Sequence, residues 1–165
     1  MDHSTADRFM VKWLGKQKDK MKNILVAIDF SEVTEEMISR AREEAACHKA
    51  KIWLVHVAAP NPDFAGFEAG PKTVRDARAK TLRKEHKRLQ QYAMDLNDQG
   101  INSEALLIQG RISQTIIAQA AKLQADLIII GSHGHGLLFS ALVGSVCEGV
   151  LKHTTIPLLI VPQRK

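Results

Sequence analysis

The hydrophobic positions along the chain form short apolar runs, separated by stretches in which apolar residues recur every three or four positions. Short runs rich in β-branched residues are typical of buried parallel strands, and the helical period is typical of helices that pack on a sheet. Five runs are predicted as strands: Ile24–Ile28, Ile52–Val57, Ala105–Ile108, Leu127–Ile130 and Leu158–Val161. The pattern therefore predicts a βαβαβαβαβ chain.

The segments between these runs are predicted as helices. We expect Ser31 and Ser113 to cap the first and third helices, because serine hydroxyls accept hydrogen bonds from free N–H groups at helix starts. The long second helix is expected over Thr73–Leu96 with Ala77 among its core residues, and the last is expected to carry Val146, Val150 and Leu151 on one side. Alternating strands and helices predict an α/β fold, a doubly wound parallel sheet with helices on both faces.

Polar, turn-rich segments follow two of the predicted strands, and doubly wound sheets bind ligands at such strand exits. Asp29 follows the first strand, and the glycine loop Gly131-Ser132-His133-Gly134-His135-Gly136 follows the fourth. Glycines let the backbone approach a ligand, and the helix that opens at Gly144-Ser145 adds N–H groups that favour an anion such as phosphate. The alternative is that the glycines only turn the chain, since the loop matches neither the P-loop nor the dinucleotide fingerprint.

The composition indicates one globular domain with an aliphatic core. The chain has 165 residues, of which 45% are hydrophobic and only 5% aromatic. No apolar run approaches the ~20 residues of a membrane span, and the N-terminus has no signal-peptide core. Cys47 and Cys147 are expected to be buried free thiols, which suits a cytoplasmic protein. His133 and His135 alone are too few ligands for a structural metal site, so we expect none.

Two basic segments leave alternatives open. Between Lys72 and Arg88, lysine and arginine outnumber Asp76 and Glu85, which indicates either a nucleic-acid partner or a solvated helix face. We favour the solvated face and expect no specific nucleic acid, because no aromatic residues for base stacking are interleaved with the charges. Residues 1–20 are expected to form an N-terminal amphipathic extension. It could dock on the domain, on a partner subunit or on a membrane surface, and we favour docking on protein.

Three motifs make residues 21–162 resemble a universal stress protein domain. They are the strand and acidic exit Lys22-Asn23-Ile24-Leu25-Val26-Ala27-Ile28-Asp29-Phe30-Ser31, the strand and loop Ala125-Asp126-Leu127-Ile128-Ile129-Ile130-Gly131-Ser132-His133-Gly134, and the ending Ile156-Pro157-Leu158-Leu159-Ile160-Val161. The resemblance implies a Rossmann-like sheet of order 3-2-1-4-5, with the domain over residues 21–165. It also implies a homodimer formed through the last strand, Leu158–Val161.

The ATP-binding members of that family carry G-x-x-G, nine residues, then glycine and serine or threonine. Here Gly131 and Gly134 are followed by nine residues and then by Gly144 and Ser145, so the resemblance implies ATP, with Mg²⁺, as the ligand. The residues implied at the site are Ile28, Asp29, Val57, Gly131, His133, Gly134, Gly144, Ser145 and Val146. Gly131, Gly134, Gly144 and Ser145 would hold the triphosphate, Asp29 would lie on the adenine and ribose side, and Val57 would contact adenine. Alternatively, Val57 and Val146 are core residues, and Asp29 only supports the dipole of the next helix.

The sequence departs from the family pattern at two places. Phe30 occupies a position where many members have glycine, and the stretch His135–Val143 lacks the arginine or lysine of many binders. Mg²⁺ or the histidines would then neutralise the phosphates, or another adenine nucleotide would be preferred. We expect a regulatory stress-response module that signals to an unidentified protein partner. The alternatives are a slow ATPase or nucleotidyl-transferring enzyme, for which no well-matched general base stands out, and a nucleotide-free interaction protein.

Overall fold

A single parallel sheet forms the centre of the computed structural model, which describes residues 21–59, 72–132 and 144–163. Its strand order is β3-β2-β1-β4-β5, and all neighbouring strands pair in parallel. The strands are β1 (Asn23–Ala27), β2 (Lys51–Ala58), β3 (Ser103–Gln109), β4 (Leu127–Gly131) and β5 (Leu158–Val161). The doubly wound fold and the expected strand order are confirmed.

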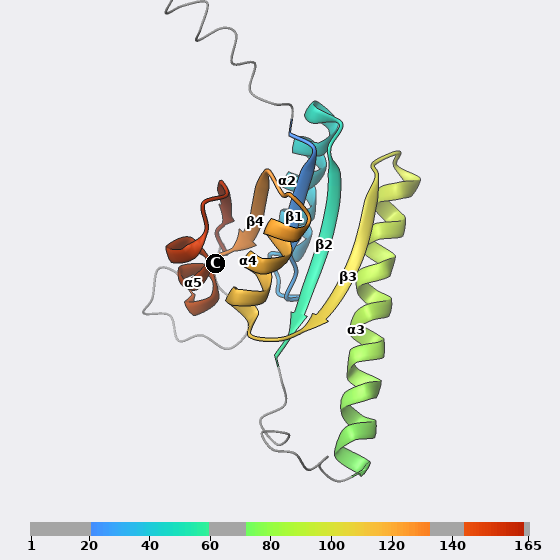
Figure 1. Ribbon diagram of the computed structural model, residues 1–165. Helices are drawn as coiled ribbons and strands as arrows, with labels where there is room; N and C mark the ends of the chain where they lie inside the picture. The colour runs from blue at the N-terminus through green and yellow to red at the C-terminus, as the bar shows by residue number, and fades with distance from the viewer. Residues whose placement is uncertain (1–20, 60–71, 133–143, 164–165) are drawn as a thin grey trace, which may run out of the picture.

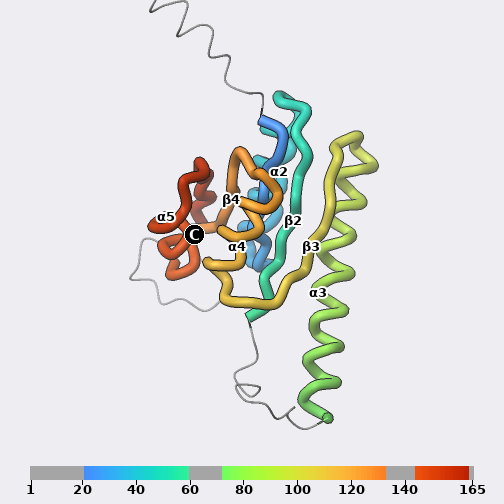
Figure 2. Tube along the Cα trace, viewed as in Figure 1, coloured from blue at the N-terminus to red at the C-terminus, as the bar shows by residue number. Residues whose placement is uncertain are grey.

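Helices cover both faces of this sheet, as Figures 1 and 2 show. They are α2 (Thr34–His48), α3 (Lys72–Asp98), α4 (Ile112–Lys122) and α5 (Ser145–His153). Residues of α2 and α3 share one hydrophobic cluster, and residues of α4 and α5 share another. The core therefore consists of two apolar layers, one on each side of the sheet.

The alternation of side chains along the strands supplies both layers. Ile24 and Val26 of β1 belong to the cluster under α2 and α3, whereas Leu25 and Ala27 belong to the cluster under α4 and α5. Successive side chains of a strand point to opposite faces, so a strand covered on both faces must be apolar at every position. This requirement explains the uninterrupted apolar runs in the sequence.

Both predicted serine caps are wrong. The hydroxyl of Ser31 donates to Asp29 Oδ1, and α2 begins only at Thr34. This local bond to the neighbouring Asp29 side chain takes the Ser31 hydroxyl away from the free N–H groups of the helix. Ser113 lies inside α4, which begins at Ile112 after an N-cap position occupied by Arg111.

Two positions predicted to be buried are exposed to solvent, and so is one residue of the apolar side expected for α5. Ala77 is exposed because the first turns of α3 extend beyond the sheet (Figure 1), and the buried residues of α3 all lie in its second half. Cys47 of α2 is exposed, whereas Cys147 of α5 is buried as expected. Leu151 of α5 is 53% exposed. Helical period identifies an apolar face, but tertiary contacts decide how far along the helix that face is covered.

Several predictions lie outside the described residues. They concern the N-terminal extension of residues 1–20, most of the loop after β2, and residues 133–143 of the glycine loop. Within the described ranges, no helix combines the length and the apolar composition needed to cross a membrane.

Candidate functional site

The exits of β1 and β4 lie next to each other, at the point where the winding of the sheet reverses. The two strands pair from Ile24 with Leu127 to Ala27 with Ile130. The residues that follow, Asp29 on one side and Gly131 on the other, therefore leave the same edge of the sheet side by side. Parallel α/β sheets bind ligands at such a reversal, and the adjacency expected from the resemblance is confirmed.

Asp29 forms a tight turn at the exit of β1. Its Oδ1 atom accepts hydrogen bonds from Ser31 N at 3.0 Å and from Ser31 Oγ at 2.6 Å. This geometry is typical of aspartate in turns. Among the described residues, the second carboxylate oxygen, Oδ2, has no hydrogen-bond partner, so it is available to accept a hydrogen bond from a ligand hydroxyl or amine.

Phe30, the next residue, adopts the left-handed backbone conformation at φ 60°. A side chain in this region costs roughly 1–2 kcal/mol, which glycine avoids. Two contacts hold the Phe30 ring: the His56 ring lies 4.7 Å away between centroids, and the Arg88 guanidinium carbon lies 5.0 Å from the ring centre. These contacts stabilise a turn that would otherwise favour glycine.

His56 connects this turn to α3. Its Nδ1 atom lies 2.8 Å from the carbonyl oxygen of Ile28, and its Nε2 atom lies 3.5 Å from Glu85 Oε2. A carbonyl oxygen can only accept, so the Nδ1 atom carries the hydrogen. Both side chains are largely buried, at 12% and 27% exposure. The sequence pattern alone did not mark His56, Glu85 or Arg88 as residues near the site. The one sign was Phe30, an aromatic residue at a position where many relatives have glycine.

The start of α5 lies beside the exit of β4. The Gly144 N–H donates to the Ser132 carbonyl at 2.6 Å, and Ser132 N donates to Val161 O at 2.8 Å, so the β4 exit is tied to both α5 and β5. Gly144 is the N-cap and has no side chain to satisfy the first N–H groups. Those groups have no intrahelical acceptors and carry the positive end of the helix dipole. Ser145, the first helical residue, is exposed.

The other predicted site residues differ in how far they are buried. Ile28 and Val57 are 3% and 7% exposed and belong to the two core clusters, and Val146 packs partly buried against the second cluster. Gly144 is buried and Gly131 is partly exposed. His133 and Gly134 lie outside the described residues. Asp29, Gly131, Ser145 and, in part, Val146 are thus the described positions among them with surface left for a ligand.

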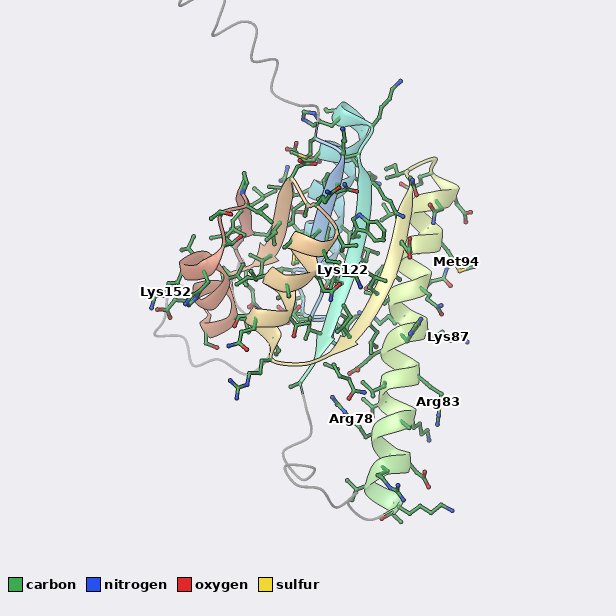
Figure 3. All side chains as sticks on the ribbon, viewed as in Figure 1. Arg78, Arg83, Lys87, Met94, Lys122 and Lys152 are labelled. Atoms are coloured by element: carbon green, nitrogen blue, oxygen red, sulfur yellow. The ribbon has the colours of Figure 1, made fainter. Side chains whose placement is uncertain are left out.

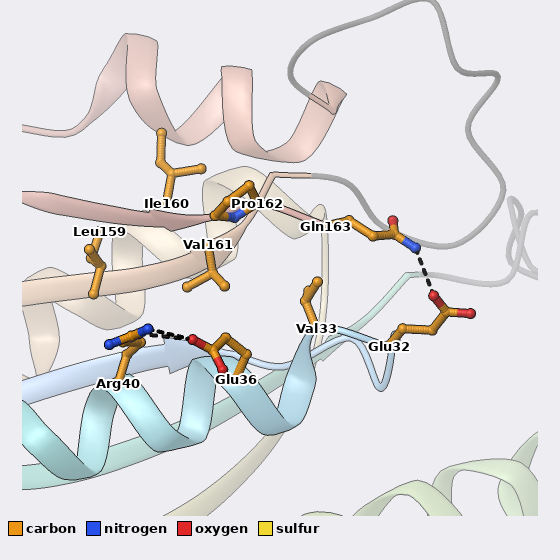
Figure 4. Close-up of a pocket in the computed structure, with 9 residues that line it drawn as sticks. All are labelled: Glu32, Val33, Glu36, Arg40, Leu159, Ile160, Val161, Pro162 and Gln163. Carbon is orange, nitrogen blue, oxygen red and sulfur yellow. Dashed lines mark hydrogen bonds and ion pairs between the residues drawn. The ribbon is translucent and has the colours of Figure 1, made fainter. Parts of the chain in front are cut away.

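A groove of about 420 Å³ lies elsewhere, between α2 and β5 (Figure 4). Its walls carry the ion pair of Arg40 with Glu36 at 2.8 Å and the hydrogen bond from Gln163 to Glu32 at 3.1 Å. The residues that line it are Glu32, Val33, Glu36, Arg40, Leu159, Ile160, Val161, Pro162 and Gln163. None of them is a predicted nucleotide residue, and the groove follows the open edge of β5.

Two comparisons give the relatives of this chain. A universal stress protein of Thermus aquaticus is 36% identical over 144 residues, covering 85% of this chain and 98% of its own length. The solved structure of the hypothetical protein MJ0577 superposes with a TM-score of 0.78 at 25% identity, covering 88% of this chain and 98% of that one.

Two further solved structures share the fold at lower identity. One is a universal stress protein in complex with cAMP, at TM-score 0.59 and 19% identity, covering 87% and 98% of the two chains. The other is the Archaeoglobus fulgidus protein in complex with dAMP, at TM-score 0.56 and 20% identity, covering 86% and 98%. The model of the universal stress protein family matches residues 20–162, and this chain belongs to that family.

Proposed function

We propose that this protein binds an adenine nucleotide, with ATP as the first candidate, at the adjacent exits of β1 and β4, and acts as a regulatory stress-response module. The observation that carries the proposal is the adjacency of Asp29 and the start of α5 across neighbouring strands. One exit supplies a carboxylate for hydroxyl or amine groups. The other supplies backbone N–H groups and the Ser145 hydroxyl for phosphate. The two bound relatives support the same ligand class.

Mg²⁺ fits this site only as a companion of the phosphates. No group of three or more His, Cys, Asp or Glu side chains suited to a metal occurs among the described residues. Mg²⁺ prefers to keep waters and bind substrate phosphates through one or two protein oxygens. When bound, the ion would offset phosphate charge, and this chain would hold the nucleotide through the α5 N–H groups and Asp29.

A charge substitution at Ser145 tests the phosphate side of the site without damaging the helix. Ser145→Asp places a negative charge at the first position of α5, which favours the helix dipole but repels phosphate. We expect at least a tenfold loss of affinity for ATP by calorimetry, an unchanged or higher melting temperature, and little change in affinity for adenosine. Ser145→Ala is the matched control and should lose much less.

Asp29→Asn tests the side of the site that would bind the hydroxyl and amine groups of the nucleotide. It keeps the side-chain oxygen that forms the turn but removes the negative charge. The exposed Asp95→Asn on α3 changes net charge equally and should leave binding unchanged. The whole proposal fails if mass spectrometry of the purified protein finds no nucleotide and calorimetry finds no heat with ATP and Mg²⁺. Steady release of ADP that Asp29→Asn abolishes would instead favour an ATPase.

The open edge of β5 supports a homodimer of a cytoplasmic protein as part of this proposal. Ile128 N donates to Pro157 O and Ser132 N donates to Val161 O, so these alternate positions of β5 face β4. The N–H and C=O of Ile160 therefore point to the open edge. Ile160→Pro removes that donor, and light scattering should then give the 18.3 kDa monomer, whereas Ile160→Val should keep a dimer of twice that mass. A monomeric wild-type protein would refute the dimer.

A further inference from the structure

The first half of α3 carries a stripe of exposed cations that nothing in the proposed nucleotide site requires. The stripe consists of Lys72, Lys80, Arg83, Lys84 and Lys87, all exposed. At 3.6 residues per turn these positions fall within about 120° of the helix circumference and span about 22 Å along the axis. Figure 3 shows Arg83 and Lys87 on the side of α3 that is turned away from the sheet.

The five cations of the stripe form no ion pair with a carboxylate of the described residues, as is also true of Lys22 and Lys122, whereas several other cations are paired. Elsewhere Arg40 pairs with Glu36 at 2.8 Å, Lys51 with Glu104 at 2.8 Å and Lys152 with Glu148 at 2.5 Å. Within the described ranges, no ion pair joins a lysine or arginine of α3 to a carboxylate.

The carboxylates near the stripe do not offset it. Glu85 lies on another side of the helix and faces His56. Within residues 72–87 of α3, Asp76 is the only carboxylate on the side of the stripe. The stripe therefore keeps most of its positive charge at the surface.

The charge order of α3 works against the stability of the helix itself. Lys80 with Lys84 and Arg83 with Lys87 are like-charge neighbours one turn apart, which destabilises a helix by a few tenths of a kcal/mol per pair. The first turn contains no acidic residue and the last turn no basic residue, the reverse of what the helix dipole favours. A surface that costs local stability in this way is typical of a binding surface.

The shape and the side chains of the first half of α3 limit which class of partner the stripe can bind. The first turns of α3 extend beyond the sheet (Figure 1), and Arg75 adds an exposed cation on a further side. Leu82 is partly buried, so the stripe presents no large exposed apolar anchor for a bilayer. It also presents no phenylalanine, tyrosine or tryptophan on which single-stranded bases could stack. A protruding cationic helix without such groups fits the phosphates that line a duplex groove, which is wide enough to admit a helix.

We propose that the stripe on α3 binds the phosphate backbone of duplex nucleic acid without reading its sequence. This inference is independent of the nucleotide site. It refines the sequence-based expectation of no specific nucleic acid, because phosphate contacts position a protein but carry no sequence information.

The test measures the salt dependence of binding of the full chain to a fluorescent duplex DNA of random sequence. If the five cations each contact a phosphate, log K falls against log salt with a slope of about −4.5, a loss of roughly 500-fold between 50 and 200 mM salt. The variant Lys80→Gln/Lys84→Gln/Lys87→Gln should lower the slope to about −1.8, a loss of roughly 12-fold over the same range.

The matched control is Lys22→Gln/Lys122→Gln/Lys152→Gln, which removes the same charge from exposed positions elsewhere. It should keep the wild-type slope. Because the α3 variant relieves like-charge repulsion, its melting temperature should equal or exceed that of the wild type, so weaker binding cannot come from unfolding.

Three outcomes would overturn the proposal. They are no duplex binding at 50 mM salt, equal effects of the two triple variants, and binding to vesicles containing about 30% phosphatidylserine without binding to the duplex. The last result would assign the stripe to an anionic membrane surface. Equal affinity for several unrelated duplex sequences is the expected result for backbone recognition.

Discussion

The guanidinium carbon of Arg88 lies 5.0 Å from the centre of the Phe30 ring, and this contact joins α3 to the exit of β1. His56 lies on the same ring, with its centroid 4.7 Å away. Cation–π and aromatic contacts of this kind contribute about 0.5–1.5 kcal/mol each. Together they hold a left-handed residue directly after Asp29, so the backbone at the candidate nucleotide site depends on a helix from another part of the chain.

Substitutions of Phe30 should separate backbone strain from ring packing. Phe30→Ala and Phe30→Gly both lose the ring contacts, and both should be less stable than the wild type. The glycine variant should be the more stable of the two by about 1 kcal/mol in urea denaturation, because it removes the left-handed strain.

The reverse order is expected at an ordinary helical position. Gln90 is exposed on α3, and there alanine should be more stable than glycine by about 1 kcal/mol. If Phe30→Ala were as stable as Phe30→Gly, the left-handed backbone at Phe30 would not be a source of strain.

His56→Leu should reduce the free energy of unfolding by about 2 kcal/mol, because it leaves the carbonyl oxygen of the buried residue Ile28 without its donor. His56→Asn, whose amide can replace Nδ1, should recover part of the loss. His153→Leu is the control, since this exposed histidine also contacts a backbone carbonyl, that of Gly149, and should cost under about 0.5 kcal/mol. Equal losses at both histidines would contradict the role given to His56.

Gly110→Ala should destabilise the start of α4 by about 1–3 kcal/mol, because a Cβ at this position would overlap Thr115 Oγ1. Removing that oxygen with Thr115→Ala should restore most of the loss in the double variant. Gly100→Ala offers a contrast: nothing lies within 4 Å of its Cβ, but its φ of +79° disfavours alanine. Adding Thr115→Ala to Gly100→Ala should therefore leave the loss of stability unchanged. If Thr115→Ala also restored the stability of Gly100→Ala, the steric explanation for Gly110 would be refuted.

The two cysteines should differ in reactivity. Burial raises the pKa of the Cys147 thiol, while Cys47 is exposed on α2. At pH 8, iodoacetamide should label Cys47 within minutes and Cys147 only after urea unfolding, which peptide mass mapping can follow. A raised pKa means that the neutral thiol favours the fold below its ordinary pKa, and that this contribution is lost as the pH rises through the raised value. Early labelling of Cys147 in the native protein would contradict its burial.

Local pattern was enough to predict most of the fold. The uninterrupted apolar runs identified the strands because strands covered on both faces must be apolar at every position. Their alternation with helical periods required a parallel, doubly wound sheet, and the residues at strand exits pointed to Asp29 and Gly131. Helix caps and exposure were predicted less well. The Ser31 hydroxyl bonds to Asp29 in its own turn instead of capping a helix, and the exposure of Ala77 and Cys47 depends on tertiary contacts.

The sequence by itself therefore determined the order of strands and helices, and by resemblance the strand order, because these depend on local hydrophobic period and short motifs. Only the tertiary structure decided which residues meet at the exit of β1. Phe30, His56 and Arg88 come from three separate elements, and no local pattern relates them. The tertiary structure also decided that the first half of α3 extends beyond the sheet. Which turns of this helix are buried depends on where the sheet that it packs against ends.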